Sequence, residues 1–194
     1  MKSNLLLLIL CLGCYVGQAQ TDVNLNVVNI LLFDASGSIE KGINDNISFG
    51  GFTGYFYGMP DLADEDGYNK YFYIGPELKY YVYPKGKLDR FFVGLYAKYS
   101  NGEAKASNWD YYSNTPAEQP VSHYNKFAFG ISMGSKWVTK NNIIFGFFGG
   151  LDRNLVSNYE NKDYLNYDTG SSDHENFGFR IGVHIGYRFD AASK

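Results

Sequence analysis

The chain has 194 residues, a formal net charge of −3 at pH 7 and an aromatic content of 18%, with 18 Tyr, 15 Phe and 22 Gly. This mildly acidic balance gives no electrostatic reason to expect nucleic acid as a partner. The two cysteines, Cys11 and Cys14, stand so near the start that removal of a leader would exclude both disulfides and thiolate chemistry from the mature chain.

The first 19 residues have the features of a secretory signal peptide. Lys2 supplies a positive charge, residues 5–10 form a short apolar segment, and residues 17–19 offer small residues at the usual cleavage spacing. We predict cleavage after Ala19, so that residues 20–194 form one domain. The alternative is a lipoprotein signal that would use Cys14, although Cys11 stands where such a signal has an aliphatic residue.

Strand-like segments fill the rest of the chain, separated alternately by short turns and long polar connections. The clearest strands are residues 47–57, 71–83, 90–100, 124–138, 143–154 and 177–189. Short turns are predicted at residues 44–46, 84–89 and 140–142, and long connections at residues 59–69, 101–122 and 156–175. Short turns at one end and long loops at the other are typical of outer-membrane barrels.

An even number of strands requires two more before residue 47. The last strand would run inward and end at the periplasm, so a periplasmic N-terminus needs one outward and one inward strand first. We therefore predict strands at residues 23–32 and 36–43, joined near residues 33–35, which gives eight in total. Pro76 lacks a donor for the strand ladder, and we expect a bulge or a local break there.

Residues 177–189 alternate with period two, which puts successive side chains on opposite faces of a strand. The odd positions are all apolar or aromatic, whereas the even positions are Gly, Arg or His. The first face suits lipid, and the second suits a narrow lumen. The fold class predicted is an all-β, eight-stranded antiparallel up-and-down transmembrane barrel, with short periplasmic turns and three long extracellular loops.

The C-terminal segment carries a resemblance to a known class. Residues 182–189 resemble the insertion signal read by the barrel assembly machinery, with Tyr187 and Phe189 as its aromatics, although residues 190–194 follow. Together with the leader and the strand spacing, the chain is similar to the small eight-stranded barrels of the OmpA/OmpX-like and "outer membrane protein beta-barrel" families. The resemblance implies residence in the outer membrane of a Gram-negative bacterium, among membrane lipid and lipopolysaccharide, and no particular activity.

The alternation also places charged side chains in the lumen. An eight-stranded barrel has an interior just wide enough for side chains to fill, so charges there must pair. We predict a structural plug, with a narrow ion path as the alternative. An acidic group assigned to the wrong face is a further alternative, and it would balance the basic excess. The predicted network comprises Glu40, Glu77, Lys79, Lys98, Lys126, Lys136, Arg180, His184 and Arg188, with Asp152 as a further candidate.

No catalytic site, metal site or cofactor is predicted. Ser122 and His123 are adjacent and would point to opposite faces of a strand, and the His-x-Ser motif of PagL-type lipid A deacylases is absent because Asn125 stands at the serine position. The acidic residues 61–67 lack the spacing of an EF-hand loop. A divalent ion bridging them to lipopolysaccharide phosphates is the alternative.

The long connection around residues 107–112 concentrates aromatics. Trp109, Tyr111 and Tyr112 could contact an extracellular partner, whose identity the sequence does not indicate, or dip into the outer leaflet. We therefore predict a non-enzymatic outer-membrane barrel with a structural or adhesive role through its loops. A lipid-modifying barrel enzyme and a small ion channel are the alternatives.

Overall fold

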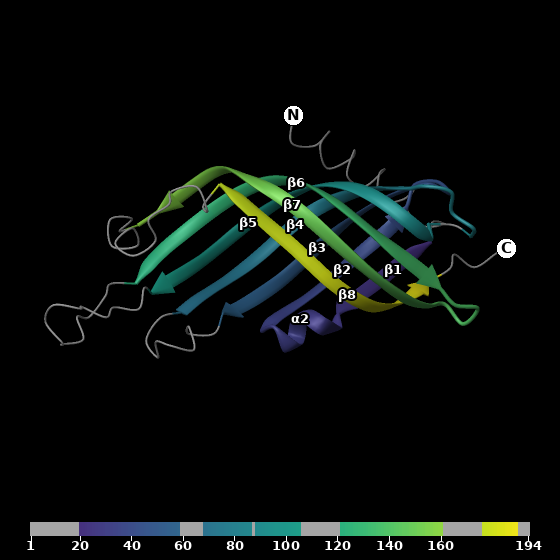
Figure 1. Cartoon of the computed structure of the whole chain (residues 1–194), viewed down its shortest axis with the longest axis horizontal. Coiled ribbons are helices and arrows are strands. Elements are labelled where there is room, and N and C mark those ends of the chain that lie inside the picture. Colours follow the sequence, from purple (N-terminus) through teal and green to yellow (C-terminus); the bar gives the residue numbers. More distant parts are fainter. Residues whose placement is uncertain (1–19, 59–67, 87, 106–120, 161–175, 190–194) are drawn as a thin grey trace, which may run out of the picture.

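The computed structural model describes residues 20–58, 68–86, 88–105, 121–160 and 176–189. Its strands are antiparallel, and each pairs with the next until β8 meets β1, so they close into one eight-stranded barrel (Figure 1). This is the predicted fold. Within the described ranges, no helix is long and apolar enough to cross a bilayer. The elements are β1 (Thr21–Asn26), α2 (Val27–Leu31), β2 (Asp34–Gly42), β3 (Ile47–Gly58), β4 (Tyr68–Tyr81), β5 (Arg90–Lys105), β6 (Ser122–Val138), β7 (Ile143–Tyr159) and β8 (Phe177–Phe189).

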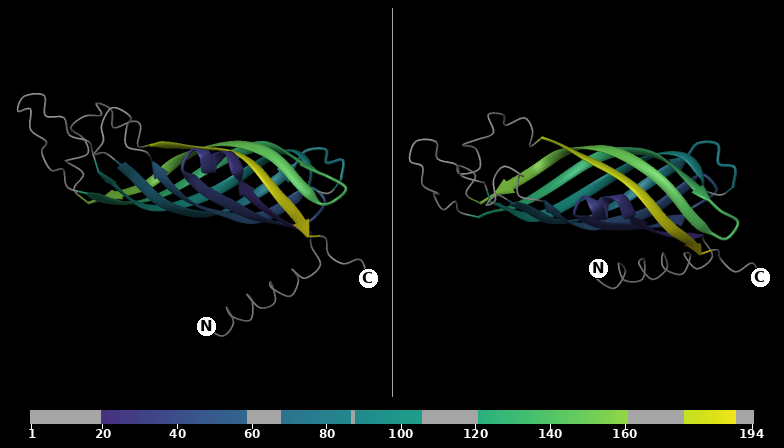
Figure 2. Two further views of the ribbon diagram at one scale, coloured as in Figure 1. Left: turned by 90° about the horizontal axis from the view of Figure 1, so that it is seen from below. Right: turned by 60° about the horizontal axis from the view of Figure 1, so that its bottom comes forward.

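The two ends of the barrel differ in their connections. At the short-turn end, Thr21 of β1 lies opposite Phe189 of β8, and few residues join β2 to β3, β4 to β5 and β6 to β7. At the long-loop end, β3, β5 and β7 end and the chain continues into longer connections (Figure 2). The leader, the acidic residues 61–67 and the aromatics Trp109, Tyr111 and Tyr112 lie outside the described residues.

Alternating side chains divide the barrel into an apolar outside and a filled inside. Phe179 of β8 is 77% exposed on the outer face, whereas Tyr96 of β5 is 1% exposed in the lumen. Glycine makes room for the larger lumen groups: a Cβ at Gly54 would come within 2.5 Å of the Tyr73 ring. The period-two pattern therefore corresponds to an exposed apolar outer face and a tightly packed inner face.

The strand predicted at residues 23–32 is wrong in its second half. β1 ends at Asn26, and α2 follows as a single helical turn. Residues 27–33 are apolar except Asn29, so an extended conformation would turn half of these apolar side chains into a polar lumen. The helical turn instead leaves Ile30 and Leu31 exposed on the outside, while Asn29 is buried and donates to Asp34. A helix also satisfies its own backbone groups in lipid.

The remaining differences are local. Pairing of β4 with β5 is interrupted between Ile74 and Glu77, without a change of register, which is the local break expected at Pro76. The one register shift between described strands lies between β6 and β7, at Phe127 and Ala128. β6 and β7 have 17 residues each, more than the roughly 9–11 that cross the hydrocarbon. At the long-loop end, β5 and β7 continue to Lys105 and Tyr159 and β6 begins at Ser122, so the strands there are longer than predicted.

Candidate functional site

A charge network crosses the lumen near the short-turn end. The Lys136 ammonium on β6 lies 2.6 Å from Asp22 Oδ2 on β1 and 2.8 Å from Glu40 Oε1 on β2. Arg188 on β8 donates from Nε to Asp22 Oδ1 at 2.8 Å and from Nη2 to Asp22 Oδ2 at 2.9 Å. These side chains come from opposite walls and are almost completely buried. The network therefore joins the walls across the barrel.

The network continues toward the middle of the barrel through Glu40. Lys79 Nζ on β4 lies 3.0 Å from Glu40 Oε2, and the Tyr81 hydroxyl donates to Glu40 Oε1 at 2.6 Å. The Lys136 and Lys79 ammonium groups also lie over aromatic rings, 4.7 Å from the Tyr81 centroid and 4.8 Å from the Phe92 centroid respectively. Each of these two ammonium groups thus has a carboxylate and an aromatic ring beside it.

Glu77 and Arg180 form the central part. Glu77 Oε1 accepts from the Ser132 hydroxyl at 2.7 Å and lies 4.0 Å from Arg180 Nη1. The Arg180 guanidinium is enclosed by rings, with its carbon 3.5 Å from the Phe52 centroid and 4.7 Å from the Tyr96 centroid. Rings and charges together fill this level of the lumen.

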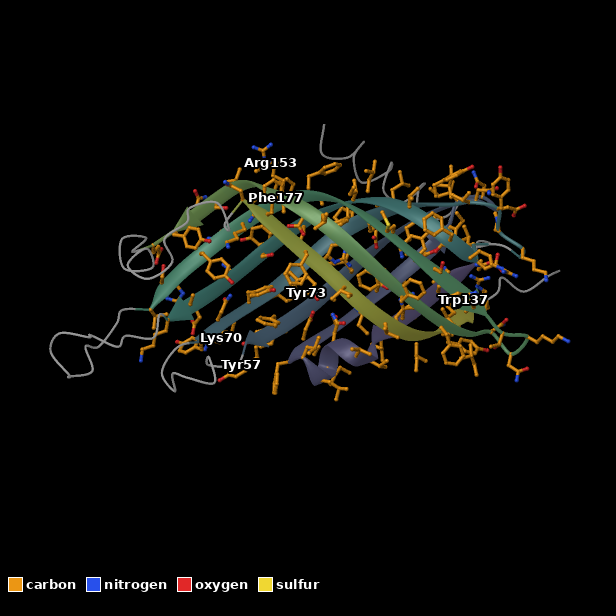
Figure 3. The ribbon with its side chains drawn as sticks, viewed as in Figure 1. Tyr57, Lys70, Tyr73, Trp137, Arg153 and Phe177 are labelled. Carbon is orange, nitrogen blue, oxygen red and sulfur yellow. The ribbon has the colours of Figure 1, made fainter. Side chains whose placement is uncertain are left out.

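A separate ion pair lies toward the long-loop end. Lys98 Nζ on β5 lies 2.6 Å from Asp152 Oδ2 on β7, which also accepts from the Tyr96 hydroxyl at 2.9 Å. Asp34 on β2 accepts from the Tyr73 hydroxyl at 2.9 Å and from Asn29 Nδ2 at 3.0 Å. Ion pairs and phenol–carboxylate hydrogen bonds therefore occur together along the lumen. Figure 3 draws the side chains on the barrel and labels Tyr73.

The structure places all of the predicted lumen residues on the inner face, but not in one network. Lys126 lies near the long-loop end, with its ammonium 4.9 Å from the Tyr124 ring centroid. Among the described residues, buried His184 has no hydrogen-bond partner for Nε2. Sequence reasoning missed Asp22, an acid that helps to balance the basic excess, because the predicted first strand began one residue too late. The residues brought together by ion pairs are Asp22, Glu40, Glu77, Lys79, Lys136, Arg180 and Arg188, with Lys98 and Asp152 as a separate pair.

The turn between β4 and β5 closes the short-turn end. Leu88 is 2% exposed and packs with Tyr81 and Phe92 inside the barrel. Its carbonyl accepts from Arg188 Nη2 at 3.1 Å, and its amide donates to the Asp45 carbonyl at 3.2 Å. An apolar side chain thus covers the charge network from below, which the polar composition of this turn did not suggest.

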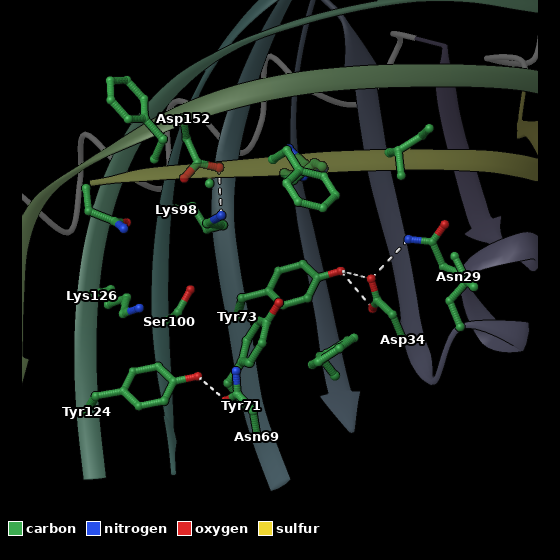
Figure 4. A pocket seen from close by; sticks show the side chains of 18 of the residues that line it. Asn29, Asp34, Asn69, Tyr71, Tyr73, Lys98, Ser100, Tyr124, Lys126 and Asp152 are labelled. Carbon is green, nitrogen blue, oxygen red and sulfur yellow. Dashed lines mark hydrogen bonds and ion pairs between the residues drawn. The ribbon is translucent and has the colours of Figure 1, made fainter. Parts of the chain in front are cut away.

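The upper half of the lumen holds a cavity of about 360 Å³ (Figure 4). Its lining comes from α2 and from every strand except β1, and it includes Tyr71, Tyr73 and Tyr124. The Tyr124 hydroxyl donates to Asn69 Oδ1 at 2.8 Å. Lys98 and Asp152 lie on the same lining. The lumen is therefore packed with ion pairs in its lower half and hollow above them.

A polar cluster lies on the outer face at the long-loop end. Lys70 Nζ of β4 is 2.6 Å from Glu103 Oε1 of β5, and the Tyr68 hydroxyl donates to the same oxygen at 3.1 Å. Tyr99 is the last aromatic of the outward apolar band on β5 and precedes Glu103 by four positions, so the cluster lies beyond that band. The hydrogen bond from Lys70 lowers the pKa of Glu103, and the reverse contact raises the pKa of Lys70.

The residues weighed for catalysis do not form a site. Ser122 is completely buried, whereas the neighbouring His123 side chain is 58% exposed and its Nδ1 lies 3.9 Å from Glu103 Oε2. In the described part of the chain, no three His, Cys, Asp or Glu side chains are grouped so as to hold a metal ion.

Comparison with solved structures places this architecture in a class. A major outer membrane protein from Thermus thermophilus matches with a TM-score of 0.53 at 12% identity, over 88% of this chain and 99% of that chain. The N-terminal β-barrel domain of Pseudomonas aeruginosa OprF (TM-score 0.47, 13% identity, 89% of this chain and 99% of that chain) and Neisserial surface protein A (0.45, 12%, 89% and 95%) are also similar. The match to the Thermus protein shows that the chain shares the barrel fold of that protein.

The family is established by sequence. The chain belongs to the family described as "Protein of unknown function (DUF3575)", whose model matches residues 4–187. No curated protein matches it.

Proposed function

We propose that this protein is a non-enzymatic barrel of the outer membrane of a Gram-negative bacterium, with a structural or adhesive role. Its lumen is plugged by its own charged side chains, and its contacts with other molecules are made from the long-loop end, which faces the cell exterior. The observation that carries the proposal is the position of Lys136, bound to Asp22 and Glu40 from across the lumen. Such a cross-barrel bridge suits closure of the lumen and stability of the barrel.

Further observations support the plug. Leu88 seals the short-turn end, and the Arg180 guanidinium stands between rings at the centre. Ser122 and His123 point to opposite faces, which offers no support for a hydrolase on the barrel wall. The predicted partners follow from the proposed location. They are outer-membrane lipid, lipopolysaccharide, and the barrel assembly machinery, which would read Tyr187 and Phe189 during insertion.

Planar bilayer recording tests the plug. Purified protein inserted at increasing concentration is expected to give no discrete conductance steps, because an ion would have to break several buried ion pairs to pass. Regular steps that scale with the amount of protein would contradict the plug and favour the channel. Lipid A profiles of cells with and without the protein test the absence of enzymatic activity, and an unchanged profile is expected.

A further inference from the structure

The barrel wall is incompletely hydrogen-bonded on one side. β1 pairs with β8 only as far as Asn26, which lies opposite His184. β8 begins at Phe177, and its residues 177–183 have no strand partner on this side in the described part of the chain. β2 pairs with β1 only from Gly37. The short helix α2 lies in this interval, against β8 and β2 (Figure 1). We call the interval between α2 and residues 177–183 the side opening.

The cavity of the upper lumen reaches the side opening. Phe177, Phe179 and Ile181 belong to the outward face of β8, where each is at least 60% exposed. They nevertheless border the same cavity as Tyr73 and Arg180, which belong to the inner face. Residues of both faces of β8 therefore border one cavity, along the part of β8 that is not paired with β1. The upper lumen therefore opens sideways.

The side opening faces lipid rather than water. On the side of the opening formed by α2 and its C-cap residue, the exposed fractions of Ile30, Leu31 and Leu32 are 56%, 77% and 57%. These side chains continue the apolar band of the barrel, as do Phe179 and Ile181 opposite them. An apolar chain lying in the membrane would contact apolar side chains on both sides of the opening, those of residues 30–32 and those of β8. This contact would lie in the leaflet next to the long loops.

Beyond the opening the cavity is polar, and among the described residues that line it cations outnumber acids. Lys98, Lys126 and Arg180 line it, against Asp34 and Asp152. Both carboxylates already accept hydrogen bonds from neighbouring side chains, as described above. Among the described residues the lining therefore has one more cation than acids, which favours an anionic group that arrives from the membrane.

We propose that the upper lumen binds a single-chain anionic amphiphile, with its head in the cavity and its acyl chain leaving through the side opening into the outer leaflet. A volume of about 360 Å³ is close to that of a dozen water molecules at roughly 30 Å³ each, and it lies at the small end of ligand pockets. That space suits one head group and the start of one chain. The ion pair of Lys98 with Asp152 lies on the cavity lining, and the ion pair of Glu77 with Arg180 lies below it, toward the short-turn end. The ligand would therefore bind in the upper lumen without passing through the barrel.

Photolabelling of the full-length protein in lipid nanodiscs tests this site. The probe is dodecanoic acid with a diazirine close to the carboxylate, and labelled residues are mapped by mass spectrometry. Because the head enters the lumen, we expect labelling of inward residues such as Tyr71, Tyr73 or Tyr124. The same photoreactive group beside a quaternary ammonium head or a maltose head is expected to label these residues much less.

Two matched pairs of variants locate the path. Asn29→Phe places a ring in the cavity lining, whereas Val28→Phe places the same ring on the same helix away from that lining. Ile181→Trp narrows the opening, and Ile131→Trp adds the same bulk to a lipid-facing site on β6 with similar exposure. We expect lumen labelling to fall about tenfold in the first member of each pair and to be unchanged in the second.

The result that would overturn the site is labelling confined to outward residues all around the barrel, as expected of bulk lipid. Equal lumen labelling by the cationic and anionic probes would overturn the charge assignment. Heat-modifiable migration on a gel shows that each variant is folded, and if Asn29→Phe does not fold, the Ile181 pair decides alone. These outcomes are independent of the conductance test, so the plug and the amphiphile site stand or fall separately.

Discussion

Replacing Lys136 with methionine tests whether the charge network holds the barrel walls together. The substitution keeps a long side chain and removes the ammonium group, whose Nζ now lies 2.6 Å from Asp22 and 2.8 Å from Glu40. Removing one partner of a buried ion pair typically costs about 3–5 kcal/mol. Since Arg188 still contacts Asp22 and Lys79 still contacts Glu40, we expect the lower value, about 3 kcal/mol.

The assay is equilibrium unfolding in urea of protein inserted into lipid vesicles, followed by tryptophan fluorescence and extrapolated linearly to zero denaturant. Lys140→Met is the matched control, because Lys140 lies exposed in the turn between β6 and β7 and should change stability by less than about 0.5 kcal/mol. If Lys136→Met unfolds at the same urea concentration as the control, the network does not stabilise the barrel and the reasoning fails.

Three further predictions concern other parts of the barrel. Tyr81→Phe removes a 2.6 Å hydrogen bond to the buried Glu40 carboxylate and should cost about 1.5–3 kcal/mol in the same unfolding assay; an unchanged midpoint would argue against that bond. Gly146→Ala would put a Cβ 2.4 Å from His184 Nε2, while at Gly149 nothing lies within 4 Å, so only the first variant should be destabilised, by about 1–3 kcal/mol, and equal effects would contradict the packing. The pKa of Glu103 is lowered in the folded protein. The contact therefore adds stability at pH values above the unfolded pKa of this carboxyl, and that stability is lost as the pH falls through the folded pKa. In Lys70→Gln the NMR titration midpoint of Glu103 should rise, and an unchanged midpoint would refute the contact.

Periodicity was sufficient for most of the fold. Strict alternation from Phe177 to Phe189 predicted the last strand with its bounds and facing, and parity of the strand count supplied the first two strands. The lumen charges followed from the same alternation. These inferences worked because a lipid-facing strand must show its apolar face on every second residue.

Uniformly apolar and irregular segments could not be predicted in the same way. Residues 27–33 carry no alternation, so nothing in their pattern distinguished a strand from the helical turn α2. The side opening depends on where β1 stops, and Asp22 was missed for the related reason that strand ends are poorly marked. Leu88 stands in a polar turn, and only the folded chain shows that its side chain enters the lumen.

The most direct test of the account is a heat-modifiability gel on the detergent-solubilised outer-membrane fraction. A membrane barrel is expected to be recovered in that fraction. The unboiled sample is expected to migrate differently from the boiled one, because a closed barrel persists in the detergent of the gel until it is heated. Recovery in the soluble periplasmic fraction, with no difference in migration, would contradict a membrane barrel and require the apolar faces to pack against each other.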